Sequence, residues 1–261
     1  MQRSLLTAAS GMKAQQLQVD TIANNIANAN TTGFKKNALD FRALFYQTLR
    51  QPGAAAGPSQ MDATGLQVGS GVEVAGSRMT MTQGAVELTG GRFDLAIQGN
   101  GFFEVQLPSG ESRYTRDGAL RVDGNGDLVT ADGYYVLPRT TFPSGVSEIQ
   151  IAPTGEISYL DDVGEVQALA TMQITTFPNA LGLRMEGANL YAETPSSGTP
   201  TPLTPGSAGA GVLVHGALER SNVQTVDELV GLIVAQRSYE VNSRAIQVSD
   251  EMLQQANQII R

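Results

Sequence analysis

Residues 123–127 alternate acidic and amide side chains with glycine, as the first ligands of a calcium-binding loop do. Such a loop needs a glycine at its sixth position for a sharp turn and a bidentate glutamate at its twelfth. These two positions hold Leu128 and Tyr134. The segment therefore predicts a tight turn and no metal ligand.

Other groups suited to chemistry are scarce. The one histidine, His215, leaves a Ser/His/Asp triad a single possible base, and cysteine is absent. The pair Asp161-Asp162 cannot flank a scissile bond, because neighbouring side chains on a strand point apart. Residues 99–101 lack the third glycine of a dinucleotide-binding fingerprint. We expect no catalytic, cofactor-binding or metal site.

The composition argues against nucleic acid and membrane partners. The 25 acidic and 17 basic residues give a formal net charge of -8, which opposes binding to phosphate backbones and anionic lipid. No apolar run reaches the roughly 20 residues of a membrane span. Lys13 and several glutamines interrupt the opening stretch, so we expect no Sec-type signal. Charged residues make up only 16% of the chain, which suggests that much of its surface faces protein.

The first segment predicts a helix from about residue 4 to residue 30. It contains no proline, and it carries an apolar stripe at seven-residue spacing that consists of Leu5, Met12, Val19 and Ile26. Asparagines and threonines then weaken the helix propensity. Gly33 can adopt the left-handed conformation that ends helices.

The last segment predicts a longer helix that begins between residues 221 and 225 and runs to residue 261. Residues 225–228 form a capping-box pattern. The heptad stripe of this segment consists of Leu232, Tyr239, Ile246, Leu253 and Ile260. A second apolar set, which includes Val234, Val241, Val248 and Met252, lies beside it. One partner helix cannot cover so wide an apolar arc.

Between the two helices the apolar period changes to two. Phe93, Leu95 and Ile97 alternate with other residues, and further strand-like runs follow as far as residue 177. Asp-Gly and Asn-Gly pairs mark tight turns at hairpin spacing. The expected fold class is α+β, with the N- and C-terminal helices paired in a coiled-coil layer and an inserted, mainly antiparallel β domain.

Two stretches rich in Pro, Gly, Ala and Ser flank the β region, at residues 51–59 and 199–211. We expect residues 1–34 and 222–261 to form a terminal helical polymerisation domain. Residues 71–198 are then the β domain, and residues 35–70 and 199–221 are extended connectors.

The energetics of the last helix favour assembly. Burial of its stripe contributes about 1.5–3 kcal/mol per side chain, whereas ordering its backbone costs about 1–2 kcal/mol per residue, only partly offset by its hydrogen bonds. Pairing with the first helix leaves the side of Val234 and Met252 uncovered. Open-ended packing of copies on that side builds a helical polymer. The alternative is that both helices lie on the β domain of their own subunit, which fits the periodicity equally well.

The end of the first helix carries the most specific motif, since residues 23–36 read ANNIANANTTGFKK. Further motifs are DLAIQGNGFF at residues 94–103, YTRDG at residues 114–118 and QRSYE at residues 236–240. In this order, and over most of the chain, they resemble the flagellar rod and hook family. We expect amides on one helix face to bond laterally to copies of the chain, as buried asparagines fix register in coiled coils. The candidate assembly residues are the two heptad stripes together with Asn24, Asn25, Asn28, Gly33 and Phe34.

The resemblance implies a structural subunit, without enzymatic activity or cofactor, of an axial polymer made of copies of itself. It implies export through the flagellum's own type III apparatus and assembly in the basal body, in the periplasmic space between the inner and outer membranes. The implied partners are proximal rod proteins, hook or junction proteins, and P and L ring proteins. Residues 45–53 and the chain length resemble distal rod members, which form a rigid hollow drive shaft that transmits torque to the hook.

Several alternatives remain at this point. Within the family, the chain could be a hook or proximal rod subunit. Outside it, a secreted adhesin-like β protein would show exposed aromatics on the β domain, and a glycoside hydrolase would show two carboxylates facing across a cleft. The absence of tryptophan weakens both of these.

Overall fold

The computed structural model describes residues 2–51, 55–57, 60–61, 64–143, 148–161 and 165–259. Contacts divide the chain into two compact units. Unit 1 comprises Met1–Ile26, Asn37–Arg78 and Gln224–Arg261, and unit 2 comprises Ala27–Lys36 and Met79–Val223. The described strand pairs whose registers are defined are all antiparallel. The expected α+β class with an antiparallel β domain is confirmed.

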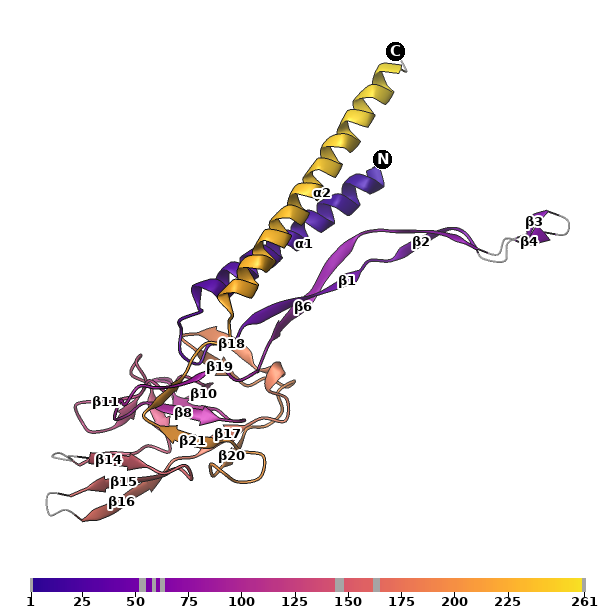
Figure 1. Ribbon diagram of the computed structural model, residues 1–261. Helices are drawn as coiled ribbons and strands as arrows, with labels where there is room; N and C mark the ends of the chain where they lie inside the picture. Colours follow the sequence, from indigo (N-terminus) through magenta and orange to yellow (C-terminus); the bar gives the residue numbers. More distant parts are fainter. Residues whose placement is uncertain are drawn as a thin grey trace. The chain divides into compact units, whose positions relative to one another are not determined.

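Two long helices dominate unit 1 and lie side by side (Figure 1). Helix α1 spans Gln2–Ala27 and ends about one turn earlier than expected, because the asparagines and threonines that follow favour turns over helix. Helix α2 spans Thr225–Ile259 and begins within the expected range. Asp227 and Glu228 in its first turn complement the positive end of the helix dipole.

A long two-stranded ribbon completes unit 1 (Figure 1). Its successive pairs are β1 (Asn37–Ala43) with β6 (Val72–Met79), β2 (Tyr46–Arg50) with β5 (Leu66–Gly69), and β3 (Ala55–Gly57) with β4 (Gln60–Met61). Residues 35–70, expected to be an extended connector, therefore contain hydrogen-bonded strands. The Pro/Gly/Ala-rich composition is confined to one stretch, whereas Phe41, Tyr46 and Val68 favour strands.

The largest sheet of unit 2 has seven strands. Its strand order is β11 (Arg121–Val122), β12 (Leu128–Val129), β13 (Tyr135–Leu137), β9 (Phe103–Gln106), β10 (Ser112–Thr115), β19 (Leu190–Ala192) and β18 (Arg184–Gly187). A separate sheet consists of β14 (Glu148–Ile151), β15 (Glu156–Leu160) and β16 (Val166–Thr171). A short 3-10 helix, η1, spans Ala180–Gly182.

Three further strand pairs in unit 2 join residues far apart in the chain. They are β17 (Ile174–Thr176) with β20 (Thr201–Leu203), β8 (Leu95–Gln98) with β21 (Val212–His215), and β7 (Val86–Leu88) with β22 (Ala217–Glu219). Residues 199–221, expected to be an extended connector, therefore contain three strands. Pairings such as His215 with Leu95 cannot be deduced from local periodicity, because the partner lies elsewhere in the sequence.

The core of unit 2 lies among these strands. Leu95, Phe103 and Ile157 are completely buried in its main apolar cluster. A second cluster contains Tyr114 and Tyr191. Burial raises the pKa of the Tyr114 hydroxyl to about 12 and raises that of Tyr191 further. The alternating residues that predicted β8 and β9 are thus the residues that form the core.

A buried ionic network crosses unit 2. Lys35 Nζ donates to Glu219 Oε1 at 2.5 Å, and Arg116 approaches Glu219 Oε2 at 3.3 Å. The same carboxylate accepts the Gly84 backbone N–H at 3.0 Å, and Lys35 also donates to the Thr82 carbonyl. Burial lowers the pKa of Lys35, while the hydrogen bond to Glu219 opposes that change.

Backbone and amide hydrogen bonds extend this network. Gly33 N–H donates to the Glu219 carbonyl at 2.8 Å, and Lys36 N–H donates to Asn222 Oδ1 at 2.8 Å. The Asn222 amide in turn donates to the Thr80 carbonyl. The network therefore ties together the segments of unit 2 through which the chain passes to and from unit 1.

We expect Glu219→Gln to lower the free energy of unfolding of unit 2 by about 3–5 kcal/mol, because Lys35 and Arg116 are left buried without a counter-charge. Chemical denaturation at neutral pH measures this change. The control is Glu87→Gln, since Glu87 pairs with Arg220 at 2.7 Å while their side chains stay 56% and 61% exposed. An exposed pair contributes at most about 1 kcal/mol. Equal losses from the two variants would contradict the assigned role of the buried network.

Candidate functional site

Helices α1 and α2 pack antiparallel, in a register that four residue pairs define. The pairs are Ser4 with Ser249, Gly11 with Asn242, Ile22 with Gly231, and Asn25 with Glu228. The two residue numbers of every pair add up to 253, so all four belong to one continuous alignment.

We call the contact made by these four pairs the seam, and apart from Ile22 its residues are small or polar. The hydroxyl oxygens of Ser4 and Ser249 lie 3.4 Å apart. A Cβ added to Gly11 would lie 2.9 Å from Asn242 Nδ2, and one added to Gly231 would lie 3.4 Å from Ile22 Cδ1. A side chain of the opposite helix therefore lies beside each of the two glycines.

The predicted apolar stripes are not the most buried parts of the helices. Leu5, Met12, Val19 and Ile26 on α1, and Leu232, Ile246 and Leu253 on α2, are all half-buried. Tyr239 is 44% exposed, and together with Val19 it lines a groove of about 390 Å³. Ile260 lies outside the described residues. Among the residues of α1 that are fully buried, Ala8, Ala14 and Asn25 are small or polar.

The three asparagines chosen from the sequence differ in their surroundings. Asn25 donates to the Asn37 carbonyl at 2.9 Å and to Glu228 Oε2 at 3.2 Å, and its Oδ1 accepts the Asn37 N–H. Lateral bonding to copies of the chain is therefore a wrong expectation for Asn25, because its amide is already used within unit 1. Asn24 is exposed, and Asn28 Oδ1 accepts a hydrogen bond from Thr31.

Gly33 and Phe34 lie in unit 2, where both are buried. Gly33 has a φ of +67°, in the left-handed region that the sequence predicted. A Cβ at this position would lie 2.6 Å from the carbonyl carbon of Arg116. The chain therefore requires glycine here both for its backbone conformation and for its close approach to a neighbouring strand end.

An exposed apolar stripe runs along α2. Val234, Val241 and Val248 follow one another at seven-residue spacing, with Val230 and Met252 four residues beyond either end. All five side chains are between 47% and 66% exposed. These residues, which we call the outer stripe, include the second apolar set that was expected to need a partner outside the helix pair.

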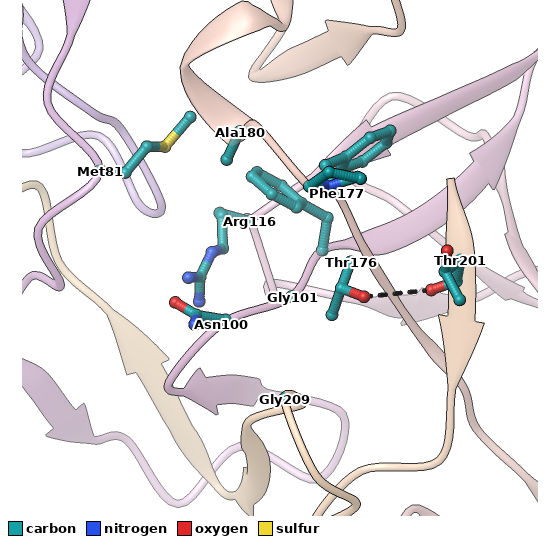
Figure 2. A pocket seen from close by; sticks show the side chains of 11 residues that line it. Met81, Asn100, Gly101, Arg116, Thr176, Phe177, Ala180, Thr201 and Gly209 are labelled. Carbon is teal, nitrogen blue, oxygen red and sulfur yellow. Dashed lines mark hydrogen bonds between the residues drawn. The ribbon is translucent and has the colours of Figure 1, made fainter. Parts of the chain in front are cut away.

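Unit 2 contains a cavity of about 450 Å³ (Figure 2). Figure 2 shows Arg116 and Asn100 on one side of it and Phe177 on another, with Thr176 bonded to Thr201. Arg116 donates to the carbonyls of Ile97 and Gly99 as well as to Glu219, so both terminal nitrogens of its guanidinium already have protein acceptors. We therefore assign this cavity no chemistry.

Within the part of the chain that the structure describes, no group of three His, Asp or Glu side chains could hold a metal ion. None of its helices is both long and apolar enough to cross a membrane.

Sequence reasoning missed the seam and the ionic network. The seam has a signal of its own, because Ser4, Gly11, Gln18 and Asn25 also repeat at seven-residue spacing. The prediction instead followed the apolar residues of the adjacent stripe. Glu219 carries no local signal, since its partners are brought to it only by the fold.

The fold thus defines an α+β chain with two paired helices, near its two ends, that carry exposed apolar side chains, and contiguous exposed apolar side chains are typical of interaction surfaces. Three family models match it: "Flagella basal body rod protein" over residues 5–35, "Flagellar hook protein FlgE/F/G D1 domain" over residues 96–159, and "Flagellar basal body rod FlgEFG protein C-terminal" over residues 214–259.

Full-length relatives agree with these matches. The flagellar basal-body rod protein FlgG of Borreliella burgdorferi is 46% identical over 264 residues, which cover 100% of both chains. The FlgG proteins of Caulobacter vibrioides and Bacillus subtilis are 43% and 40% identical, with 98% of this chain and 99% and 98% of theirs covered.

The chain therefore belongs to the flagellar rod and hook family, as a FlgG-like rod protein. It is a structural subunit of the distal rod in the flagellar basal body. This membership leaves the adhesin and glycoside hydrolase hypotheses without support.

Gly33→Ala tests the requirement for glycine after α1. We expect a loss of unfolding free energy of at least about 3 kcal/mol, since the left-handed backbone costs about 1–2 kcal/mol and the clash with Arg116 adds to it. Thermal denaturation of the full chain measures this loss.

Gly90→Ala is the matched control, because Gly90 has a φ of +69° and nothing lies within 4 Å of its added Cβ. It should lose only the backbone cost of about 1–2 kcal/mol. Indistinguishable melting of the two variants would show that the close approach at Gly33 has no energetic weight.

Proposed function

We propose that copies of this chain polymerise through α1 and α2 into the rigid, hollow drive shaft of the distal rod, which transmits torque to the hook. In this proposal the terminal helical polymerisation domain, residues 1–34 with 222–261, forms a coiled-coil layer. Residues 71–198 form the inserted β domain, and residues 35–70 and 199–221 connect the two. The chain acts by assembly, without catalysis or a cofactor.

The outer stripe of α2 is the observation that carries the proposal. Full burial of a Val or Met side chain contributes about 1.5–3 kcal/mol, and roughly half of that is still to be gained when a side chain is half exposed. Five such side chains on one helix face therefore favour contact with another chain. Repetition of the same contact from copy to copy produces a helical polymer, because a head-to-tail interface that does not close continues indefinitely.

Further apolar side chains support a second contact area in unit 1. Phe45 is 92% exposed on the segment between β1 and β2. Tyr46, Leu49 and Leu66 are also exposed on the ribbon. Contiguous apolar side chains of this kind mark interaction sites.

The proposed partners follow from the place of a distal rod subunit. Besides further copies of the chain, they are proximal rod proteins, hook or junction proteins, and the P and L ring proteins. The proposed route is export through the flagellar type III apparatus, followed by assembly in the periplasmic space. We propose no nucleic acid partner and no membrane insertion.

Truncation tests the mechanism. We expect chains without residues 1–26 or without residues 224–261 to lose sedimentable polymers, while unit 2 still unfolds cooperatively. Sedimentation and electron microscopy of the purified chains follow the polymers, and denaturation follows unit 2. Filaments built by either truncated chain would exclude assembly through the terminal helices.

A single substitution in the outer stripe makes a sharper test. Val241→Glu places a charge on a side chain that is 66% exposed in the single chain and buried in the proposed polymer. We expect at least a tenfold rise in the concentration needed for polymerisation, because the loss of one buried valine already costs about 1.5–3 kcal/mol per contact.

Val166→Glu is the matched control, since Val166 is 69% exposed on β16 of unit 2. This variant should polymerise like the unaltered chain. If it blocks assembly as strongly as Val241→Glu does, then the terminal helices are not the main contact.

A further inference from the structure

We propose that the seam between α1 and α2 sets the register in which the two helices pair, and that Gly11, Ile22 and Asn25 are its specificity-determining residues. The apolar stripes beside the seam carry no register information and remain for contacts with second copies. The role of the stripes in contacts with other copies rests on the proposed function, whereas the register is a property of the single chain.

Heptad stripes cannot choose between registers. The α1 stripe repeats every seven residues from Leu5 to Ile26, and the α2 stripe repeats in the same way from Leu232 to Leu253. A shift of one helix by seven residues places apolar side chains opposite apolar side chains again. The stripes alone would therefore allow several alignments of nearly equal energy.

Ile22 and Gly231 remove that ambiguity by their sizes. Ile22 is 4% exposed, and a Cβ at position 231 would already lie in van der Waals contact with its Cδ1 atom, at 3.4 Å, so a longer side chain there would compete with Ile22 for space. A seven-residue shift would place Ile22 opposite Ser238 in one direction and Gln224, before the start of α2, in the other. Neither position offers the space of a glycine.

Gly11 and Asn242 also distinguish the observed register from shifted ones, but here the glycine lies on α1 and the larger residue on α2. Asn242 lies so close to Gly11 that any added Cβ would meet its amide at 2.9 Å. Among the residues of the α1 part of the seam, Gly11 alone lacks a side chain. The Asn242 side chain therefore fits the observed register and meets a side chain in either shifted one.

Asn25 adds a polar requirement. It is 2% exposed, and its amide donates to Glu228 Oε2. A shift by seven residues would place it opposite Ala235 or Ser221, and the buried amide would lose this acceptor. It would keep its hydrogen bonds to Asn37 and lose the one made across the seam. Loss of a hydrogen bond by a buried polar group destabilises a fold, as in coiled coils where one asparagine determines the register.

Gln18 favours a shifted register over the observed one. Its Oε1 atom is buried and has no hydrogen-bond partner among the described residues, and the register places it opposite the buried Ala235. Shifted registers would place Gln18 opposite Asn242 or Glu228, which could satisfy it. The observed register therefore suits Gly11, Ile22 and Asn25, whereas it leaves the Gln18 Oε1 atom without a hydrogen-bond partner among the described residues.

Engineered disulfides test the register directly, because the chain contains no cysteine. Ser4→Cys with Ser249→Cys joins positions whose hydroxyl oxygens lie 3.4 Å apart. The control pair is Ser4→Cys with Ala256→Cys, which is displaced by seven residues, or about 10 Å along a helix. Both pairs leave the three determining residues unchanged.

We expect mild oxidation of the full chain to give at least tenfold more intramolecular disulfide in the first pair than in the control. Non-reducing electrophoresis separates this product from disulfide-linked dimers. Equal yields in the two pairs, or a first pair that forms mainly dimers, would overturn the proposed register. Oxidation is carried out on monomers and on polymers, so the result does not depend on polymerisation. A chain that forms the disulfide but never polymerises would refute the proposed function alone.

Compensation then tests the determining residues. In the Ser4→Cys, Ser249→Cys background, Gly11→Leu should lower the yield of the intramolecular disulfide at least fivefold, because Leu and Asn242 cannot share the space. Asn242→Ala should restore at least half of the lost yield. Failure of that rescue, or an unchanged yield in Gly11→Leu itself, would show that this contact does not determine the register.

Discussion

The close contact between α1 and α2 is the constraint on which the organisation of unit 1 depends. Along this contact a side chain of one helix lies beside a glycine of the other, as Asn242 does at Gly11 and Ile22 does at Gly231. The apolar residues of the outer stripe lie on α2 outside this contact and stay exposed. The outer stripe of α2 is therefore not covered within the single chain, which favours contact with further copies.

Unit 2 depends on the buried ionic network. The chain crosses between the two units near residues 26, 37, 79 and 223. Within unit 2, the network around Glu219 ties together the segments next to these crossings. A carboxylate between two cations is costly to bury, but it is satisfied here by three segments at once. Such an arrangement holds these segments together within the folded unit.

Local pattern was sufficient for much of the fold. The two terminal helices, the start of α2 and most strands between β8 and β17 follow from periodicity and turn residues, because a helix or strand with one buried face must repeat its apolar side chains. The short strands β10 and β12 did not follow from these patterns. Strands β21 and β22 did not follow, since their pairing partners β8 and β7 lie more than one hundred residues earlier. The same separation hid Glu219, which the sequence places far from Lys35 and Arg116 and the fold places in contact with both.

The family motifs, the two long helices and the width of their apolar arcs could be read from the amino acids alone, because each is a property of consecutive residues. Which face of each helix meets the other was decided only by tertiary structure. Apolar periodicity pointed to Leu5 and Leu232, whereas the fold selected Gly11, Ile22 and Asn25 with their partners on α2. The face is chosen by the steric and polar fit between pairs of residues. The two members of each pair lie more than two hundred positions apart, so no single stretch of sequence contains both.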